Sequence, residues 1–549
     1  MHRRWLVSRT NRQYIEYLSR SVSISPPIAQ VLINRGIKSP SDVKSFLSGR
    51  TFTEPLDMPG MKEAVEALIS AKKAGKRVLV HGDYDVDGVT ATAIMVKGLR
   101  ALGFDVQYYV PDRFRDGYGF GERGLLEAKN SGAGLIITVD CGITSFEACR
   151  CAKKEGIGVI VTDHHKPYIV DNAPLMPDAL SVVYPKEGES LSGAGVALKV
   201  IEALGLEREE FLDLAALGTV ADSVSLIGEN RAIVREGLEL LRTPLRAGIR
   251  ALSEVSALNG RAIRTGTLSF TLIPRINAAG RLANAKEAVE LFLTDDESRA
   301  AEIADSLDRL NTQRQKTEER VIEEALSIIE KKGVLPAIVL AKEDWHEGVI
   351  GIVASRIMEL YYRPTFMLSI KGQTAKGSAR SIPEFDIHSG LLRVKDILLG
   401  FGGHRQAAGL SISKSNIGDF EQRICKIVEE EVRDFTPTIV IDADVGLNEI
   451  TFNLTREISL LEPFGYGNPE PIFGSRGLEV INPRVVGNNH LKMKLRSGGT
   501  YIDSIGFDMG GIIERLNSGT IDAVYTAAVN EWEGGRNLQL NLKAIRPVA

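Results

Sequence analysis

The chain is poor in cysteine and has no long apolar run. Four of its 549 residues are cysteines, and three of these lie close together at Cys141, Cys149 and Cys151. So few cysteines exclude a disulfide framework and favour a reducing compartment. No stretch approaches the roughly 18 to 20 uncharged apolar residues that a membrane-spanning helix needs. We therefore expect a cytoplasmic protein with no membrane segment.

An excess of positive charge is also lacking. Lysine and arginine number 67 against 71 aspartates and glutamates, which gives a formal net charge of −4. This balance excludes attraction of nucleic acid to the whole surface, so any polyanion must bind a locally basic groove. What the chain does have is the composition of an ordinary globular protein, with 44% hydrophobic residues. Its length suits about three or four compact units.

Short β-branched runs alternate with helical segments between Lys76 and about Pro185. The runs lie at 77–80, 106–110, 134–139, 158–162 and 181–184. This alternation predicts a mostly parallel sheet of an α/β fold, covered by helices on both faces. In such sheets the ligand crevice lies outside the carboxyl ends of the strands. We therefore look for chemistry where the runs end.

The rest of the chain changes pattern several times. Residues 295–332 show apolar positions at three- and four-residue steps, which predicts a long helix, interpreted here as an exposed spacer joining two lobes. Short strands broken by Gly, Asn and Asp after Thr436 predict a small β-barrel. We predict five parts: a helical N-terminal segment (1–60), the parallel-sheet domain (61–230), a helical region with the long connecting helix (231–332), a second α/β domain (333–432) and the barrel (436–549).

Carboxylates crowd the turn after the first run. Asp83, Asp85 and Asp87 fall within five residues, directly between a strand and a helix. Three carboxylates desolvated together without cations cost several kcal/mol. A helix N-terminus that favours acidic residues, or a solvated acidic turn, remains an alternative for this segment taken alone. An EF-hand is excluded because its glycine and distant glutamate are misplaced.

Further acidic and imidazole side chains follow the later runs. Asp140 ends one run, Asp163, His164 and His165 end the next, and Asp222 follows an apolar segment. Singly, Asp140 or Asp222 also suits a helix cap, but strand ends of one sheet converge on one crevice. Carboxylates with few imidazoles and no thiolate suit Mn²⁺ or Mg²⁺ rather than structural zinc. More carboxylates than one ion needs imply two ions about 3.5 to 4 Å apart, with Asp140 as the candidate bridge.

These motifs resemble those of the DHH phosphoesterases. The resemblance rests on the Asp83–Gly88 segment, on Asp140 and above all on the Asp163-His164-His165 triplet. The segment from Gly402 to Gly409 is similar to the signature of the DHH-associated C-terminal domain. Three more features resemble the RecJ branch, the single-strand-specific 5′→3′ exonucleases: Pro274–Arg281, Trp345–Gly351 and the β-barrel tail, whose counterpart in that branch is an oligonucleotide-binding (OB) fold.

The resemblance implies roles for individual residues. It places two manganese (or magnesium) ions among His81, Asp85, Asp87, Asp140, His164 and Asp222, with Asp83 as a neighbour or as the ligand in place of His81. Asp163, His165, Arg281 and His404 would act in catalysis. The terminal 5′ phosphate and the DNA would meet Ser378 and Arg380, together with Arg275, Asn277, Arg314, Gly402 and Gly403. An arginine fork and a hydroxyl suit a terminal phosphate.

The implied activity is 5′→3′ digestion of single-stranded DNA to mononucleotides by two-metal hydrolysis, in DNA repair and recombination. The expected partners are single-stranded DNA, a single-strand-binding protein and a helicase. Two alternatives remain open: a small-nucleotide phosphodiesterase, phosphatase or pyrophosphatase, and a non-catalytic single-strand binder. The length of the chain argues against the first, because a dinucleotide needs no long groove. Loss of cleavage on changing Asp140 would exclude the second.

Overall fold

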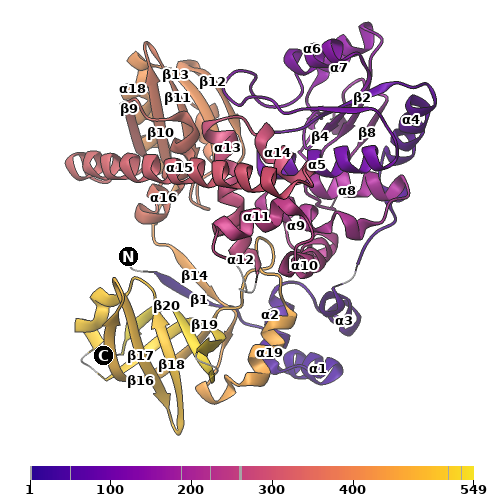
Figure 1. Cartoon of the computed structure of the whole chain (residues 1–549). Coiled ribbons are helices and arrows are strands. Elements are labelled where there is room, and N and C mark those ends of the chain that lie inside the picture. Colours follow the sequence, from indigo (N-terminus) through magenta and orange to yellow (C-terminus); the bar gives the residue numbers. More distant parts are fainter. Residues whose placement is uncertain are drawn as a thin grey trace.

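The computed structural model describes residues 3–49, 51–186, 188–222, 224–258, 263–516, 519–532 and 535–548. Two α/β lobes lie side by side in Figure 1, crossed by the long helix α15, and the barrel lies below them with the N-terminal helices. No helix of the described residues is long and apolar enough to cross a membrane.

The first lobe contains a five-stranded parallel sheet in the order β3-β2-β4-β5-β8. Its strands are β2 (Arg77–His81), β3 (Val106–Tyr109), β4 (Ala133–Val139), β5 (Gly158–Thr162) and β8 (Ser181–Val183). One face packs on α4 (Met61–Lys73), α5 (Val86–Ala101) and α8 (Gly193–Ala203), the other on α6 (Glu122–Ser131) and α7 (Phe146–Lys154). The predicted parallel sheet is confirmed, and β4 is its central strand. A small hairpin, β6 (Tyr168–Val170) with β7 (Ala173–Leu175), follows the sheet strand β5.

The core of this lobe continues well beyond the sheet. It runs without a break from Met58 to Leu307. The helices that join it are α9 (Leu212–Ala221), α10 (Gly228–Arg242), α11 (Ala247–Val255), α13 (Ile273–Leu282), α14 (Lys286–Leu293) and the first half of α15 (Glu297–Lys332). The described residues of 231–258 and 263–310 therefore share the core of the sheet and form no separate core.

Helix α15 is not the exposed spacer that its charged sequence suggested. Its first half buries Ile303 and Leu307 in the first lobe, and its second half buries Val321, Ala325 and Ile329 against the second. An α-helix of 36 residues is about 54 Å long at 1.5 Å per residue. One face is thus buried along most of that length, so α15 belongs to both lobes.

The second lobe has a mixed sheet in the order β12-β13-β11-β10-β9. Only β9 (Ile338–Glu343) and β10 (Thr365–Lys371) are parallel, while β11 (Thr374–Arg380), β12 (Leu398–Gly403) and β13 (Ala407–Ser413) run antiparallel to their neighbours. The accompanying helices are α16 (Glu347–Tyr361), α17 (Ile387–Leu392) and α18 (Ile417–Glu431).

The tail forms the expected closed β-barrel. Its strands are β16 (Phe473–Val486), β17 (His490–Ser497), β18 (Thr500–Gly506), β19 (Thr520–Trp532) and β20 (Gly535–Pro547). They pair in the order β16-β17-β18-β20-β19, and the β16–β19 pairing closes the ring. Closure removes the unpaired strand edges that an open sheet would expose. Helix α19 (Phe452–Leu460) precedes the barrel.

The N-terminal segment packs on the barrel. Strand β1 (Arg4–Val7) pairs in parallel with β14 (Thr438–Ile441), the strand that leads into the barrel. Helices α1 (Arg12–Val22), α2 (Pro26–Asn34) and α3 (Pro40–Ser48) bury Leu18, Ile28, Leu32 and Val43 in the core of the barrel. The backbone N–H of Ser25 also donates to the carboxylate of Glu457 at 2.9 Å. No pattern in the sequence predicts this packing.

Candidate metal centre and phosphate pocket

Two of the three aspartates after β2 are held by helix N-termini. Asp85 caps α5 and accepts a hydrogen bond from the backbone N–H of Gly88 at 3.1 Å. The two carboxylate oxygens of Asp87 accept from the backbone N–H groups of Gly193 and Ala194, at 2.6 and 2.9 Å. Those two groups open helix α8, so the helix end fixes the Asp87 carboxylate.

Asp140 follows β4 in an unusual backbone conformation. Its φ is 61°, in the left-handed region that few non-glycine residues adopt. A Cβ on Gly193 would stand 2.5 Å from the carboxylate atom Oδ1 of Asp140. The glycine therefore leaves the space that this carboxylate occupies.

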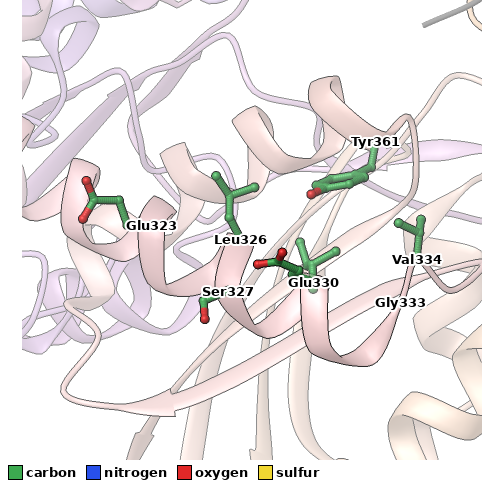
Figure 2. Close-up of a pocket in the computed structure, with 8 residues that line it drawn as sticks. Glu323, Leu326, Ser327, Glu330, Gly333, Val334 and Tyr361 are labelled. Atoms are coloured by element: carbon green, nitrogen blue, oxygen red, sulfur yellow. The ribbon is translucent and has the colours of Figure 1, made fainter.

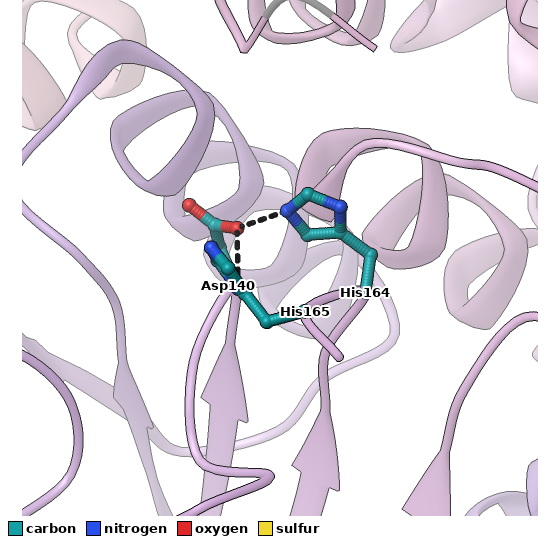
Figure 3. A group of neighbouring side chains, drawn as sticks. All are labelled: Asp140, His164 and His165. Carbon is teal, nitrogen blue, oxygen red and sulfur yellow. Dashed lines mark ion pairs between the residues drawn. The ribbon is translucent and has the colours of Figure 1, made fainter. Parts of the chain in front are cut away.

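Side chains from four separate segments meet at the carboxyl ends of the strands. His164 Nε2 lies 3.1 Å from Asp140 Oδ1, 3.6 Å from Asp222 Oδ2 and 3.8 Å from Asp87 Oδ2. Figure 3 shows Asp140 with His164 and His165 above the strand ends. The predicted convergence is therefore present in the structure. Three sets have ligand atoms that lie within 4.8 Å of one another: Asp140-His164-His165, Asp87-His164-Asp222 and Asp83-Asp85-Asp140.

The electrostatics of this cluster favour bound cations at neutral pH. Burial, and then the charge of neighbouring aspartates, raises the pKa of Asp87 to about 7 and that of Asp222 to about 8. The same causes raise the pKa values of Asp83 and Asp140 well above the usual range. Within the described residues, Asp83 Oδ1, Asp140 Oδ1 and His164 Nε2 are buried without a hydrogen-bond partner. Oxygen-rich, partly imidazole donors of this kind fit divalent Mn²⁺ or Mg²⁺.

His165 is fixed by two neighbours. Its Nδ1 lies 2.8 Å from Asp163 Oδ1, and its ring lies 3.2 Å from the hydroxyl of Tyr118. Asp163 also accepts hydrogen bonds from the backbone N–H groups of Ile143 and His164. Burial lowers the pKa of His165, but the bond and charge of Asp163 outweigh it and raise the value to about 9. Tyr118 is not among the site residues predicted from the sequence.

His81 does not join the cluster, which corrects its assignment as a metal ligand. Its ring packs against Tyr109 and Phe120, with centroids 5.5 and 5.3 Å away. Burial lowers its pKa to about 4. Within the described residues it belongs to none of the three metal-binding sets, whereas Asp83 does.

Four of the seven residues predicted to meet the phosphate and the DNA line one pocket of about 580 Å³ between the lobes. Ser378 and Arg380 line it, and the Arg380 guanidinium donates to the Ser378 hydroxyl at 3.1 Å. Gly402 and Gly403 line the same pocket from the end of β12. Arg113 enters from the loop after β3 of the first lobe. No sequence motif singles out Arg113, because its loop meets the second lobe only in the folded chain.

Arg281 sits between this pocket and the aspartate cluster. Burial, and then the positive charges of Arg113, Arg314 and Arg380, lowers its pKa to about 10. Its own backbone passes so close to Gly348 that a Cβ there would overlap the carbonyl oxygen of Arg281. Gly351 likewise leaves space for the Ser378 hydroxyl. The glycines at the start of α16 thus let the phosphate residues approach.

The remaining predicted residues are placed less directly. Arg275 pairs with Asp308 at 2.8 Å. Arg314 is buried, pairs with Glu318 at 2.6 Å and donates a hydrogen bond to Asn311. Its charge is therefore used within α15 and does not face an open groove. Asn277 is half-buried on α13. His404 is exposed in the turn between β12 and β13, where its backbone N–H donates to the carbonyl of Ala407.

A separate groove of about 660 Å³ lies at the other end of α16. Figure 2 shows Leu326, Val334 and Tyr361 along it, with Glu323 and Glu330 as its charged residues. The side chains that line this groove include no lysine or arginine, so it offers a phosphate no cationic partner.

Three family models match the chain. The DHH family N-terminal domain matches residues 77–219, the DHHA1 domain residues 331–430 and the RecJ OB domain residues 441–544. The single-stranded-DNA-specific exonuclease RecJ of Bacillus subtilis is 37% identical over 98% of this chain and 70% of the relative. The Escherichia coli protein of the same name is 34% identical over 98% of both chains.

Solved structures agree with the sequence relatives. The crystal structure of RecJ in complex with Mn²⁺ from Thermus thermophilus superimposes with a TM-score of 0.87 at 33% identity, and the alignment covers all of this chain and 80% of that one. The Mg²⁺ complex from the same source gives a TM-score of 0.81.

Proposed function

Since the chain belongs to the RecJ family of single-stranded-DNA-specific exonucleases, we propose that its aspartate and histidine cluster is the catalytic metal centre and that the pocket around Arg380 receives the 5′ phosphate. The chain is a metal-dependent exonuclease that binds and degrades single-stranded DNA. The observation that carries the assignment is the convergence of Asp87, Asp140, His164 and Asp222 around buried donor atoms that lack partners.

The residues fall into two adjacent sets of ligands. Asp83, Asp85 and Asp140 would hold one ion, and Asp87, His164 and Asp222 the other, with Asp140 near both because its Oδ1 faces His164. Two bound Mn²⁺ or Mg²⁺ ions supply positive charge to the phosphodiester and stabilise its attacking and leaving oxygens.

His165 would act on the leaving oxygen. The bond from Nδ1 to Asp163 fixes the ring, and Nε2, 3.2 Å from the Tyr118 hydroxyl, would face the substrate. The hydrogen bond and charge of Asp163 raise the pKa of the imidazole, which suits it to hold a proton and give it to the departing 3′ oxygen. Asp163 is a positioning residue, since both of its carboxylate oxygens are already bonded within the protein.

The phosphate pocket would account for the direction of digestion. We propose that Arg113, Ser378 and Arg380 bind the terminal 5′ phosphate, and that Arg281 binds the phosphate at the metal centre. Cleavage next to a held 5′ end releases mononucleotides in the 5′→3′ direction. Gly402, Gly403 and His404 would support the strand from the β12–β13 turn. Arg275 and Asn277 would line its path along α13, and the buried Arg314 would stiffen α15 behind it.

We place the protein in the cytoplasm, in DNA repair and recombination, with a single-strand-binding protein and a helicase as partners. The barrel matches the RecJ OB domain and would hold the strand beyond the active centre.

A single assay tests the proposal. Single- and double-stranded oligonucleotides with 5′-phosphate or 5′-hydroxyl ends are incubated with Mn²⁺, Mg²⁺ or EDTA, and product size is read. We expect mononucleotides from 5′-phosphorylated single strands only when a metal is present, and a reduced preference for 5′ phosphate in Arg380→Ala. Activity restricted to strands of two or three nucleotides would instead favour a small-nucleotide phosphodiesterase.

A further inference from the structure

A second cavity continues from the phosphate pocket. Its volume is about 320 Å³, and Phe114, Glu347 and Lys376 line both spaces. Its own walls come from the turn after β9, the start of α16 and the end of β10: Asp344, Trp345, His346, Ser369, Ile370 and Lys371. Cavities of about 300 to 1,000 Å³ are typical of small-molecule sites. A terminal phosphate alone leaves this second space without a role.

The two cavities differ in charge. Arg113, Arg380 and Lys376 give the phosphate pocket a positive excess over its one carboxylate, Glu347. In the second cavity, Lys371 and Lys376 balance Asp344 and Glu347. Lys371 lies 2.6 Å and Lys376 3.5 Å from the carboxylate oxygens of Glu347. The first space therefore suits phosphate groups, whereas the second suits an uncharged group.

The second cavity also has an aromatic wall. The rings of Phe114 and His346 meet edge to face, 5.6 Å apart at 84°. Phe114 is 40% exposed, so its ring remains available to a ligand. The indole N–H of Trp345 donates to Glu324 at 2.7 Å, and the Ser369 hydroxyl donates to the Trp345 carbonyl, so the wall behind the cavity is held in place. Aromatic faces of this kind stack on nucleobases of any sequence.

We propose that the paired cavities accept DNA 5′ ends capped by a nucleoside through a 5′,5′-pyrophosphate. The inference rests on the proposed function, because the pyrophosphate would occupy the pocket assigned to the 5′ phosphate. The cap nucleoside lies in the aromatic cavity. Water adds to the phosphorus that follows the first nucleotide, the bond from that phosphorus to the 3′ oxygen breaks, and the 3′ oxygen takes a proton. The products are a capped nucleotide and a strand with an ordinary 5′ phosphate.

The test uses the full-length enzyme with Mn²⁺ and a 3′-labelled single strand of one sequence. The strand is prepared in four forms, whose 5′ end is a phosphate, an adenylyl pyrophosphate, a triphosphate or a hydroxyl. We expect the adenylylated strand to be digested within about threefold of the phosphorylated one, with the triphosphate strand roughly tenfold slower, since its extra charge enters a neutral cavity and lacks a stacking base. Mass spectrometry should detect the capped nucleotide as the first product.

A variant separates the two cavities. His346→Asn removes the ring but retains a side chain that caps α16. We expect it to lower kcat/KM roughly tenfold for adenylylated strands and to leave 5′-phosphorylated strands unchanged. Ile227→Ala, an exposed apolar change in the first lobe, is the control for nonspecific loss.

The outcomes are distinguishable. Resistance of the adenylylated strand, with normal digestion of the phosphorylated one, overturns the inference and leaves the proposed function standing. Equal rates on triphosphate and adenylylated ends with no effect of His346→Asn also overturn it. Failure to digest the phosphorylated strand at all contradicts the proposed function itself.

Discussion

Asp140 combines a left-handed backbone with a buried, unpartnered carboxylate oxygen. A non-glycine residue in such a conformation costs on the order of 1 to 3 kcal/mol, and it persists only where the surrounding structure holds it. Here that support comes from β4, whose end it follows, and from Gly193, which leaves room for the carboxylate. A fixed backbone and a carboxylate oxygen without a hydrogen-bond partner are what a bridging metal ligand needs.

We therefore expect Asp140→Asn to lower Mn²⁺-dependent cleavage by roughly a thousandfold or more, since several kcal/mol of charge stabilisation is lost. Binding of single strands should remain near that of the wild type in a filter or anisotropy assay. Asp171→Asn is a matched control, because Asp171 has a φ of 51° and is exposed in the β6–β7 hairpin. Parallel loss of binding and cleavage would contradict a role confined to the metal.

The raised pKa values predict how pH affects the metal-free protein. Burial and neighbouring aspartates raise the pKa of Asp87 to about 7 and that of Asp222 to about 8. Both groups therefore remain protonated to a higher pH in the folded chain than in the unfolded chain. Their contribution to the free energy of unfolding is complete below about pH 4 and is lost as pH rises through these values. In EDTA, Tm should fall between pH 5 and pH 8, and Mn²⁺ should raise Tm most at the higher pH. Asp222→Asn should flatten the metal-free slope, and equal slopes with and without Mn²⁺ would refute the link.

The residue types of the centre were readable from the sequence, but the direction of one side chain was missed. His81 ends β2 two residues after Leu79, and alternate residues of a strand share a face. Leu79 packs in the core beneath α6 and α7, so His81 points there too. Asp83 lies beyond the strand, where this alternation no longer applies. The alternation of side chains along β2 would have placed His81 on the face away from the metal centre. The spacing of the carboxylates alone did not decide between His81 and Asp83.

At the scale of elements, the start of α8 is as much a part of the centre as the strand ends. Its first two N–H groups hold Asp87, and its first glycine borders Asp140. The signal in the sequence, Ser192 before a glycine-rich helix start, predicts only a cap. The contacts join residues 106 positions apart, which no local pattern encodes.

Two glycines of α8 give a matched pair of variants. A Cβ at Gly193 would meet Asp140 atoms at 2.5 Å, whereas one at Gly195 would meet its nearest neighbours at 3.4 Å. Gly193→Ala should weaken Mn²⁺ binding and cleavage by at least roughly tenfold, because the carboxylate must move. Gly195→Ala should stay close to the wild type in metal titration and activity. Equal effects of both changes would show that the approach of α8 to Asp140 is unimportant.

At the scale of the whole molecule, the barrel and the N-terminal helices are one packing unit. Removing residues 436–549 alone would uncover Leu18, Ile28 and Leu32, which now lie in the barrel core. We expect that truncation to aggregate, since several buried aliphatic side chains become exposed. A fragment of residues 51–435 should remain folded and cleave short strands, with lower affinity for long ones. Light scattering and strand-length assays on both fragments check this, and a well-behaved 1–435 fragment would contradict it.

The layers of the fold followed from the sequence because strand and helix periods are local. The α/β lobe, the long helix and the barrel were all visible as patterns. What joins them was not visible: α15 looked exposed because its polar face is charged throughout, yet Val321 and Ala325 bury the opposite face. The pairing of β1 with β14 spans 434 positions, from Arg4 to Thr438. Such distant partners carry no signature in either segment.

The packing of the N-terminal helices on the barrel sets an order for folding during biosynthesis. Ser25 leaves the ribosome 432 residues before Glu457, its hydrogen-bond partner. At roughly 5 to 20 residues per second, the aliphatic faces of α1 to α3 wait on the order of 20 to 90 seconds for the strands that cover them. Until then the nascent chain exposes the apolar surface of α1 to α3, which chaperones and proteases can bind. Interrupted translation would leave that apolar surface exposed, so truncated chains should be degraded while the complete enzyme is not.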